Sequence, residues 1–597
     1  MTTQDTRYPY PTEWNVTLLY SSFNDPQFEK DMRAYERAYA QFEKKYKGKT
    51  DWLKNKKKLL TALGDWRALS ETVGSLKPMV YVHLRASVDS SNEEVQARVS
   101  ALSQRITNTA NKIVFFGLAL GKIPAPFQKS ILADKAFTHY AHLLKHIFNT
   151  SKYDLSESEE KILNLMSLPA YDLWVRGVEK ALNEKTVIHK GTTMPLSEAM
   201  NSIHTLKTED RYALHDKVMK ELVRVADFST SEINAIYTDK KISDELRGFK
   251  TPYAATLLSH EISEKTLKQL LSSVNKYKRV SHNFYAVKAQ LLKLDTLRYP
   301  DRAASVGNTS EKITFEEAVA LASAGFEKFG PWYKETFQTF LRNGQIDVFP
   351  RKGKEGGAFC WGGLNRPTFV LLNHIENLDS VLTLAHEMGH AFHTELSKKQ
   401  DVLYQGYSTA VAEVASTFFE NIVFEEVFKT LSKREQVIAL HDRINDDIQT
   451  IYRQIACFNF ELDLHTAIRT KGNVSTAEIA DMMNARMREY LGPLFSLTKE
   501  DGYFFITWSH IRRFFYVYSY AYGQIISKAL YKKYVEQPSF AKKIEEFLSA
   551  GGSATPERIF KKIGIDTTKP GFFEEGLKSI AENIRRLEVL AKEEKLI

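Results

Sequence analysis

Cysteine is scarce in this sequence of 597 residues, which contains only Cys360 and Cys457. A secreted scaffold held by disulfides would use more at this length, so the pair indicates a reducing compartment. No run of about 18 apolar residues occurs, which argues against a membrane-spanning helix. The opening MTTQDTRYPYPTEW has neither the basic region nor the apolar core of a secretory signal. We therefore predict a cytoplasmic protein without a membrane partner.

Concentrated charge is also lacking. The formal net charge is +9, and the densest basic run is Lys44–Lys58. A nucleic-acid-binding protein gathers such charge into a patch, and this run has no glycine-rich or aromatic RNA-binding signature. We interpret the run as a solvated helix face and expect no nucleic-acid partner. Contact with nucleic acid or another anionic surface is the alternative.

Helical periodicity is abundant. Apolar residues recur every three or four positions in a composition that is 43% hydrophobic and 26% charged, which predicts a mainly α globular protein. Ser229 with Glu232, and Thr314 with Glu317, have the spacing of capping boxes. The segments with helical periodicity are 24–60, 92–120, 157–184, 209–225, 229–246 and 263–292.

The domain border is weakly marked, because no low-complexity linker interrupts the chain. The polar stretch near residues 185–208 is the best candidate for it. We therefore predict an N-terminal helical domain over residues 1–195 and a second domain over residues 196–597, which contains the motifs described below.

Residues 345–373 break the helical pattern. This segment has several glycines and two short apolar runs, Gly357–Trp361 and Thr368–Leu372, which are typical of strands. A small β-sheet is therefore predicted just before the stretch TLAHEMGHAFHTEL. Asp379 is placed to cap the helix that would contain this stretch.

His386, Glu387 and His390 form the pattern H-E-x-x-H within that stretch. On a helix, residues four apart share a face, so the two imidazoles can converge on one zinc ion. Glu387 is next to His386 in the sequence, so it lies on a neighbouring side of the same helix. From there it can act as a general base beside the metal. Helix-surface histidines that meet by chance are the alternative, because the motif is only a hypothesis until its context fits.

A zinc site needs a third protein ligand. His393 is about 10.5 Å along the helix axis from His386, at 1.5 Å per residue. One straight helix rarely brings such a pair to one ion, so we expect His393 to be a polar wall that contacts substrate, or else a structural histidine. Other peptidase spacings fail, because the positions where they place the third ligand are Leu396, Thr409 and Ala410.

Glu413 is the better candidate for the third ligand. It lies in the apolar stretch VAEVAS, where an unpaired carboxylate would cost several kcal/mol. Zinc would supply the missing cation, and a salt bridge to lysine or arginine is the alternative. Glu420 is seven residues further on the same helix face. It can orient a ligand histidine by accepting its second N–H, although a surface carboxylate is an equally simple interpretation.

The motifs HEMGHAFH and AEVAST together resemble the M3 family of zinc oligopeptidases, the thimet oligopeptidase and oligoendopeptidase F group. Three further stretches resemble the same family: GKEGGAFC, WSHIRRFFYVYSYAYG and, near the start, TEWNVTLLYSSFNDPQF. The resemblance covers essentially the whole chain. It implies a helical clamshell with a deep central channel, a small sheet beside the zinc helix, and one Zn²⁺ per chain. It also implies oligopeptide substrates and an oligoendopeptidase F-like N-terminal domain.

The resemblance also assigns roles to residues. It makes His386, His390 and Glu413 the zinc ligands and Glu387 the catalytic acid and base. The C-terminal segment contributes His510 and two tyrosines that face the scissile carbonyl, where a tyrosine hydroxyl can donate to the oxyanion. The tyrosines alternate along the segment, and the family spacing can be aligned in more than one way. We choose Tyr516 and Tyr520 and hold Tyr522 in reserve; packing roles for Tyr516, Tyr518, Tyr520 and Tyr522 are the alternative.

The glycine-rich stretch resembles a turn that the family places over its substrate. Gly356, Gly357 and Ala358 are therefore expected to bind substrate. The strand edge Phe369–Asn373 is expected to pair with the backbone of an extended peptide.

These observations predict a zinc-dependent endopeptidase that hydrolyses internal bonds of short oligopeptides. The alternatives are another zinc hydrolase, such as an aminopeptidase or carboxypeptidase, and a non-enzymatic helical scaffold that binds peptides. The sequence leaves open whether the protein is a monomer or a small homo-oligomer.

Overall fold

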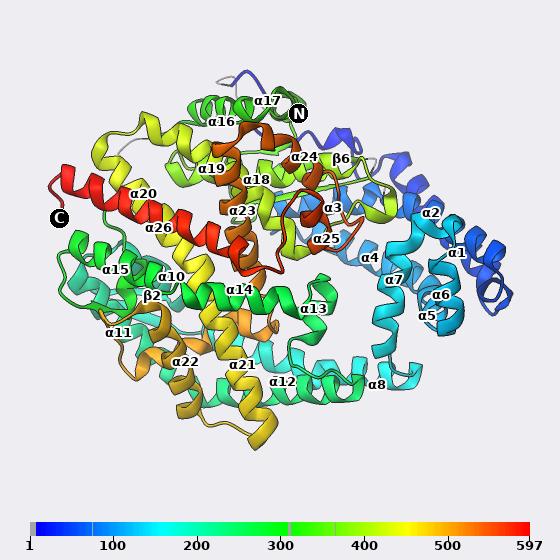
Figure 1. Ribbon diagram of the computed structural model, residues 1–597, viewed down its shortest axis with the longest axis horizontal. Helices are drawn as coiled ribbons and strands as arrows, with labels where there is room; N and C mark the ends of the chain where they lie inside the picture. Colours follow the sequence, from blue (N-terminus) through cyan, green and yellow to red (C-terminus); the bar gives the residue numbers. More distant parts are fainter. Residues whose placement is uncertain (1–7, 75, 308–311, 365) are drawn as a thin grey trace.

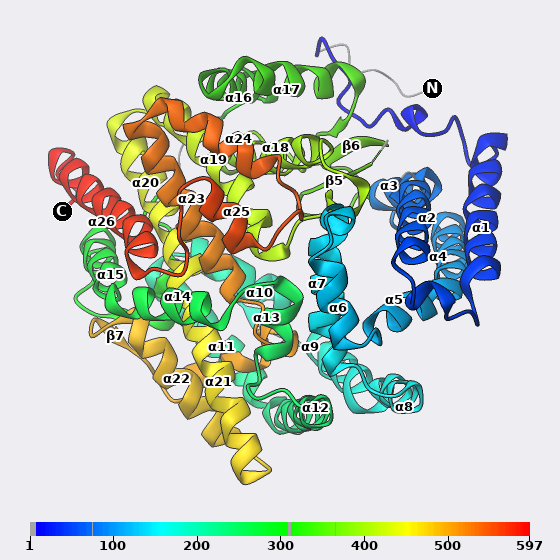
Figure 2. The same ribbon diagram turned by 45° about the vertical axis from the view of Figure 1, so that its right-hand side comes forward.

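The chain folds into two helical bodies that flank a small β-sheet (Figures 1 and 2). The computed structural model describes residues 8–74, 76–307, 312–364 and 366–597. The first seven residues of the opening stretch MTTQDTRYPYPTEW, including the part that lacks the features of a secretory signal, lie outside this range. No helix in the described part of the chain is long and apolar enough to cross a bilayer. The predicted mainly α fold class is confirmed.

The N-terminal body is built around an apolar cluster that runs from Trp14 to Leu144. Its first helix, α1, is capped by Asp25, whose side chain accepts from the backbone N–H of Gln27 at 2.9 Å. The body and the helices that follow it comprise α1 Pro26–Tyr46, α2 Lys56–Gly74, α3 Lys77–Val88, α4 Glu93–Ala110, α5 Val114–Gly121, α6 Ala125–Leu132, α7 Ala141–Thr150, α8 Glu157–Ser167 and α9 Leu173–Asn183.

The basic run lies in a helix break. The predicted helix over residues 24–60 is interrupted after α1 because Gly48 adopts a left-handed φ of 75°. Lysines of the run are exposed and form ion pairs with carboxylates. Nζ of Lys47 lies 2.6 Å from Oε1 of Glu43, and Nζ of Lys58 lies 2.7 Å from Oδ2 of Asp51. This arrangement agrees with the interpretation of a solvated surface.

The second body contains the larger apolar cluster, which begins at Val187 and continues to the last helix. Its strands outside the central sheet are β1 Thr186–His189, β2 Thr192–Pro195, β3 Leu297–Arg298 and β7 Phe495–Ser496. Its helices are α10 Leu196–Ser202, α11 Thr208–Val223, α12 Ala226–Arg247, α13 Ala254–His260, α14 Glu264–Lys276, α15 Arg279–Leu292, α16 Phe315–Phe329, α17 Pro331–Asn343, α18 Leu378–Ser397, α19 Thr409–Thr430, α20 Lys433–Ile448, α21 Gln454–Lys471, α22 Thr476–Leu491, α23 Tyr518–Glu536, α24 Ala541–Leu548, α25 Pro556–Lys562 and α26 Pro570–Glu593.

The two apolar clusters divide between Leu144 and Val187, whereas the border predicted at residues 195 and 196 falls between β2 and α10. Nothing in the fold fixes that border more closely, so it stays a prediction.

The central sheet joins the two bodies. Its strands, β4 Ile346–Asp347, β5 Phe359–Gly363 and β6 Arg366–Leu371, stand in the order β4–β6–β5. Successive side chains of β6 alternate between faces. Phe369 and Leu371 enter the apolar cluster of the N-terminal body, while Val370 enters that of the second body. The N-terminal segment reinforces the joint, because the indole of Trp14 donates to the carbonyl of Val370 at 2.8 Å.

Strand order corrects one sequence prediction. The edge expected over residues 369–373 is wrong, because β6 is paired on both sides, parallel to β4 and antiparallel to β5. The outer strands of this sheet are β4 and β5. Backbone hydrogen bonds from Asn15 to Gly344 and from Val348 to Thr12 place the N-terminal segment beside β4, so β5 is the free edge among the described residues. A buried apolar run such as β6 indicates a central strand, and neighbours on both faces are what bury it.

Two predicted helix caps are also wrong, and one is confirmed. Ser229 lies inside α12, which begins at Ala226, so it is not an N-cap. Asp379 lies in the first turn of α18, whose N-cap is Asn377; the Asn377 side chain accepts from the Ser380 N–H at 2.9 Å. The capping box of Thr314 and Glu317 is present at the start of α16.

Candidate metal centre

The close packing of α18 against α19 builds the site. At Gly389, one residue before the second histidine of the motif, a Cβ would lie 2.6 Å from the Cα of Ser416 and 2.8 Å from the carbonyl oxygen of Ala415. Only glycine fits so near another backbone. The α18–α19 approach therefore places the histidine face of α18 against the part of α19 that contains Glu413.

Three side chains converge on one point. Oε2 of Glu413 lies 3.3 Å from Nε2 of His386 and 3.7 Å from Nε2 of His390. The three potential ligand atoms all lie within 4.8 Å of one another. A tetrahedral zinc ion with bonds near 2.05 Å separates its ligand atoms by about 3.3 Å. The distances from Oε2 of Glu413 to the two imidazole nitrogens are close to this value.

The protonation preferences of these groups suit metal binding. Burial lowers the pKa of His390 to about 4 against the opposing charge of Glu413, which favours a neutral imidazole. Burial disfavours ionisation of Glu413, but the hydrogen bond from His386 and the neighbouring His390 outweigh it and lower its pKa to about 2. Two imidazole nitrogens and a carboxylate oxygen form a set of zinc ligands that leaves a fourth position open. No lysine or arginine pairs with Glu413 in the described part of the chain, which disfavours the salt-bridge alternative.

Glu387 lies beside this cluster and is 6% exposed. Burial, together with the nearby charge of Glu413, raises its pKa to about 7 against the opposing influence of His386. Its Oε2 has no hydrogen-bond partner among the described residues. A carboxylate with an unsatisfied oxygen next to a metal site is available to take a proton from water.

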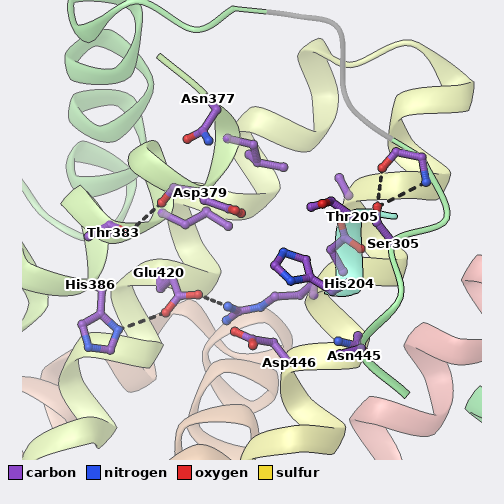
Figure 3. Close-up of a pocket in the computed structure, with 17 residues that line it drawn as sticks. His204, Thr205, Ser305, Asn377, Asp379, Thr383, His386, Glu420, Asn445 and Asp446 are labelled. Carbon is purple, nitrogen blue, oxygen red and sulfur yellow. Dashed lines mark hydrogen bonds and ion pairs between the residues drawn. The ribbon is translucent and has the colours of Figure 1, made fainter. Parts of the chain in front are cut away.

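Behind the cluster, Glu420 lies within hydrogen-bonding distance of one imidazole. Its Oε2 lies 3.1 Å from Nδ1 of His386, and its Oε1 pairs with the guanidinium of Arg443 (Figure 3). Arg443 also donates to Oδ1 of Asn421 at 2.8 Å. A carboxylate that accepts from Nδ1 fixes the tautomer and leaves Nε2 free to bind a metal. The contact is the one that the predicted orienting role of Glu420 requires, and the role itself stays a prediction.

A cavity of about 1010 Å³ opens on the same side (Figure 3). His386 and Glu420 lie at its wall, together with the start of α18 and residues of α20. Glu387 and Glu413 are not among its lining residues, so the cavity reaches the metal cluster from the side of His386.

His510, Tyr516 and Tyr520 form a second group. The ring of His510 stacks on that of Tyr516 with centroids 5.5 Å apart, and the hydroxyls of Tyr516 and Tyr520 are 3.4 Å apart. Gly523 lies one turn after Tyr520 on α23, and a Cβ there would be 3.0 Å from the Cβ of Glu413. Because residues three apart share a helix face, this contact brings Tyr520 to the side of the metal cluster.

Known protein families match most of this chain. A model of peptidase family M3 matches residues 209–579, and a model described as Oligopeptidase F matches residues 120–177. The first match includes more than half of the chain. The chain belongs to peptidase family M3. It is therefore a peptide hydrolase, and the M3 resemblance found in the sequence is confirmed.

Relatives and solved structures are similar to nearly the whole chain. Oligopeptidase PepF of Bacillus subtilis is 26% identical over 599 residues, which covers 97% of this chain and 87% of that protein. A peptidase from Chlamydophila abortus superposes with a TM-score of 0.86 at 23% identity and covers 97% of this chain and 98% of that one. Oligoendopeptidase F from Enterococcus faecium superposes with a TM-score of 0.69 at 19% identity, with coverage of 95% and 99%. At these identities the two structures establish the M3 fold.

Two predicted substrate contacts do not line the M3 site. His393 is 1% exposed, and its ring stacks on Tyr407 with centroids 3.7 Å apart, so it belongs to the wall behind the site. Tyr522 is fully buried against Phe573. Its position on α23 is two residues from Tyr520, which turns it to the opposite side of the helix. Neither side chain is exposed in this structure, so their contact with substrate stays a prediction.

The glycine-rich stretch lies where a substrate could reach it. Gly356 and Gly357 are exposed, and a Cβ at either would meet no atom within 4 Å. Asn373 anchors the loop by donating to the carbonyl oxygens of Glu355 at 2.9 Å and Gly357 at 2.7 Å. Ala358 leads directly into the edge strand β5. The structure therefore keeps this loop as a candidate for substrate binding.

Sequence reasoning missed Arg443. It lies on α20, is 6% exposed and holds Glu420. The available signal was its place in the apolar pattern of ALHDRIND, where a buried guanidinium needs an acidic partner. Its partner lies on another helix, and sequence spacing alone does not identify it.

Proposed function

We propose that this M3 peptidase is a zinc-dependent endopeptidase that hydrolyses internal bonds of short oligopeptides. The observation that supports it best is the convergence of His386, His390 and Glu413 at zinc-like spacing with Glu387 beside them. Relatives named oligopeptidase and oligoendopeptidase F support peptide substrates of limited length.

Each group has one role in the proposed hydrolysis. Zinc, when bound, supplies a Lewis acid that polarises the scissile carbonyl and acidifies water. Glu387 takes the proton of the attacking water and returns it to the leaving amine. Tyr516 and Tyr520 present their hydroxyls, and His510 its ring, to the oxyanion that develops on the carbonyl. Glu420 keeps the imidazole of His386 in the tautomer that binds metal.

The substrate backbone pairs with the free edge of β5 in this proposal. An extended peptide can add to a sheet edge through main-chain hydrogen bonds, which tolerate many side chains. The exposed loop that contains Gly356 and Gly357 precedes this edge and closes over the peptide. This arrangement replaces the edge first expected at residues 369–373.

A digest of peptides of graded length, blocked at both ends, tests the proposal. We expect internal cleavage that stops when a chelator removes the metal and returns when Zn²⁺ is added. Glu387→Gln should retain about one Zn²⁺ per chain while kcat falls by about 10²- to 10⁴-fold, the usual contribution of a general base. Metal content is measured by atomic absorption and kcat by chromatography of the products.

The alternatives give different results in the same digest. An aminopeptidase would not cleave peptides with a blocked N-terminus, and a carboxypeptidase would not cleave those with a blocked C-terminus. A chain that binds no stoichiometric metal would contradict the proposal. Full turnover by Glu387→Gln would refute the base assignment alone.

A further inference from the structure

The segment Ser509–Val517, here called the strap, places two of the proposed oxyanion-facing groups. It consists of a 3₁₀-helix over Ser509–Arg512 and five residues that lead into α23. His510 lies near its beginning and Tyr516 near its end. Because their rings stack on each other, the path of the strap determines whether both reach the substrate.

The strap has an unusual backbone. Phe514 and Phe515 are consecutive residues with positive φ, at 48° and 62°. Residues with a Cβ rarely enter this region, and bulky ones less often still. A strained conformation persists only where the surrounding structure holds it, and such strain is concentrated at functional sites.

Glu461 supplies a direct contact. Its Oε1 accepts from the backbone N–H of Phe515 at 2.9 Å, at the point of strain. Glu461 lies on α21 and is fully buried, and its Oε2 has no hydrogen-bond partner in the described part of the chain. Burial raises its pKa to about 8, although the Phe515 hydrogen bond opposes the shift. Burying a carboxyl with an unsatisfied oxygen costs stability, and the hydrogen bond that Glu461 does make is to the strap.

Further contacts hold the strap on either side of this point. Thr256 donates to the carbonyl of Phe514 at 2.9 Å, and Tyr237 donates to that of Ile511 at 3.0 Å. The guanidinium of Arg512 forms a buried bidentate pair with Glu232, with both N–O distances at 2.6 Å. Tyr171, from the segment between α8 and α9, donates to the carbonyl of Arg512.

We propose that Glu461 is a positioning residue, which holds Phe515 so that the strap presents His510 and Tyr516 beside Tyr520. The role depends on the proposed function, because it assumes that these groups act in hydrolysis. Glu461 itself touches no reacting atom. Its contribution is made through the strap, as an acceptor that a glutamine could replace.

Kinetics of two variants test this role. Glu461→Met removes the acceptor at similar length, and we expect kcat to fall by about 10- to 100-fold while KM changes less than about threefold, because misplaced groups weaken transition-state stabilisation. Glu461→Gln keeps the acceptor and should remain within about threefold of wild type. A loss in Glu461→Gln as large as in Glu461→Met would overturn the role.

A double-mutant cycle asks whether Glu461 acts through Tyr516. In a Tyr516→Phe background, Glu461→Met should cost at least about threefold less in kcat than it does in the wild type, because the Tyr516 hydroxyl is already gone and only the placement of His510 is left to lose. A full additional loss would show that the two residues act independently and would overturn the proposal. Thr256→Val removes a different anchor of the strap. It should show the same kcat-selective loss, and it keeps the test usable if Glu461→Met does not fold.

Hydrogen exchange separates this inference from the proposed function. The Phe515 amide should be protected in the wild type and in Glu461→Gln and should exchange at least about tenfold faster in Glu461→Met. Unchanged protection in Glu461→Met overturns the positioning role whether or not the wild type hydrolyses peptides. Ser281→Ala, which removes a buried hydrogen bond to the carbonyl of Tyr490, is the control: it should leave kcat and Phe515 exchange unchanged.

Discussion

A single missing methyl group at Gly389 allows the two ligand-bearing helices to meet. We expect Gly389→Ala to push α18 away from α19, because the new Cβ would contact backbone atoms of Ala415 and Ser416 that cannot rotate aside. The cost should be about 1–3 kcal/mol of stability, with weaker zinc binding. Gly117→Ala in α5 is the matched control, since its Cβ would meet no atom within 4 Å, and it should be neutral or slightly stabilising. Thermal unfolding and zinc titration measure both effects, and equal behaviour of the two variants would contradict the prediction.

The tautomer of His386 depends on one carboxylate. Glu420→Gln should weaken zinc binding by about 10- to 100-fold, because the amide is a poorer acceptor for Nδ1–H and no longer neutralises Arg443. Competition with a chelator of known affinity measures the change. Glu426→Gln on the same helix removes only surface pairs with Lys328 and Lys429 and should leave zinc affinity unchanged. A zinc affinity in Glu420→Gln that equals the wild type would show that this hydrogen bond does not tune the site.

At the scale of elements, the free edge of β5 leads to a test with modified substrates. Peptides with a single N-methylated backbone amide, scanned through a good substrate, should lose kcat/KM at alternate positions. Pairing at an edge uses the N–H of every second residue. The loss should be about tenfold per removed hydrogen bond, near 1 kcal/mol. A uniform effect at all positions, or none, would argue against pairing with β5.

The sequence could predict those features that depend on contacts between residues close together in the chain. Glu413 could be found because a carboxylate in an apolar helix needs a cation, and H-E-x-x-H because its spacing is set by one helix turn. The edge at Phe369–Asn373 was predicted wrongly, because strand order depends on pairing between segments distant in the chain. Ser229 satisfied the capping pattern but lies inside a helix, where its hydroxyl meets Glu232, the buried partner of Arg512. These two errors arose where a tertiary contact outweighed a local signal, whereas the Asp379 cap failed locally, because Asn377 caps the helix two residues earlier.

At the scale of the whole molecule, histidines from the N-terminal body face carboxylates of the second body. On α7, Nδ1 of His146 lies 2.9 Å from Glu261, which follows α13, and Nε2 of His142 lies 3.5 Å from the same carboxylate. Nε2 of His139 lies 3.3 Å from Oδ2 of Asp401. These contacts join the two bodies through pairs of an imidazole and a carboxylate.

The direction of each pKa shift defines the pH range in which these contacts between the two bodies are strongest. The hydrogen bond to Glu261 raises the pKa of His146 above its usual 6.5, so that contribution is present below 6.5 and lost as the pH rises through the raised value. Burial opposes ionisation of Glu261, but the bonds from His142 and His146 lower its pKa from 4.5 to about 2. Its contribution is therefore present above 4.5 and lost as the pH falls toward 2. The contact of His142 and His146 with Glu261 should be strongest between about pH 4.5 and 6.5.

Glu261→Gln removes the carboxylate charge and should lower the Tm most near pH 5.5 and least near pH 8. The effect should be about 1 kcal/mol at most, because His146 is 37% exposed and water screens the pair. Glu264→Gln, which removes a carboxylate that pairs with Lys268 rather than with a histidine, is the control and should give a Tm difference that is flat from pH 5 to 8. If the Glu261→Gln difference is equally flat, the histidines do not hold the two bodies together. If it peaks as expected, the joint between the bodies loosens as the pH rises past neutrality, and the same contacts then set how readily the N-terminal body separates from the metal-bearing one.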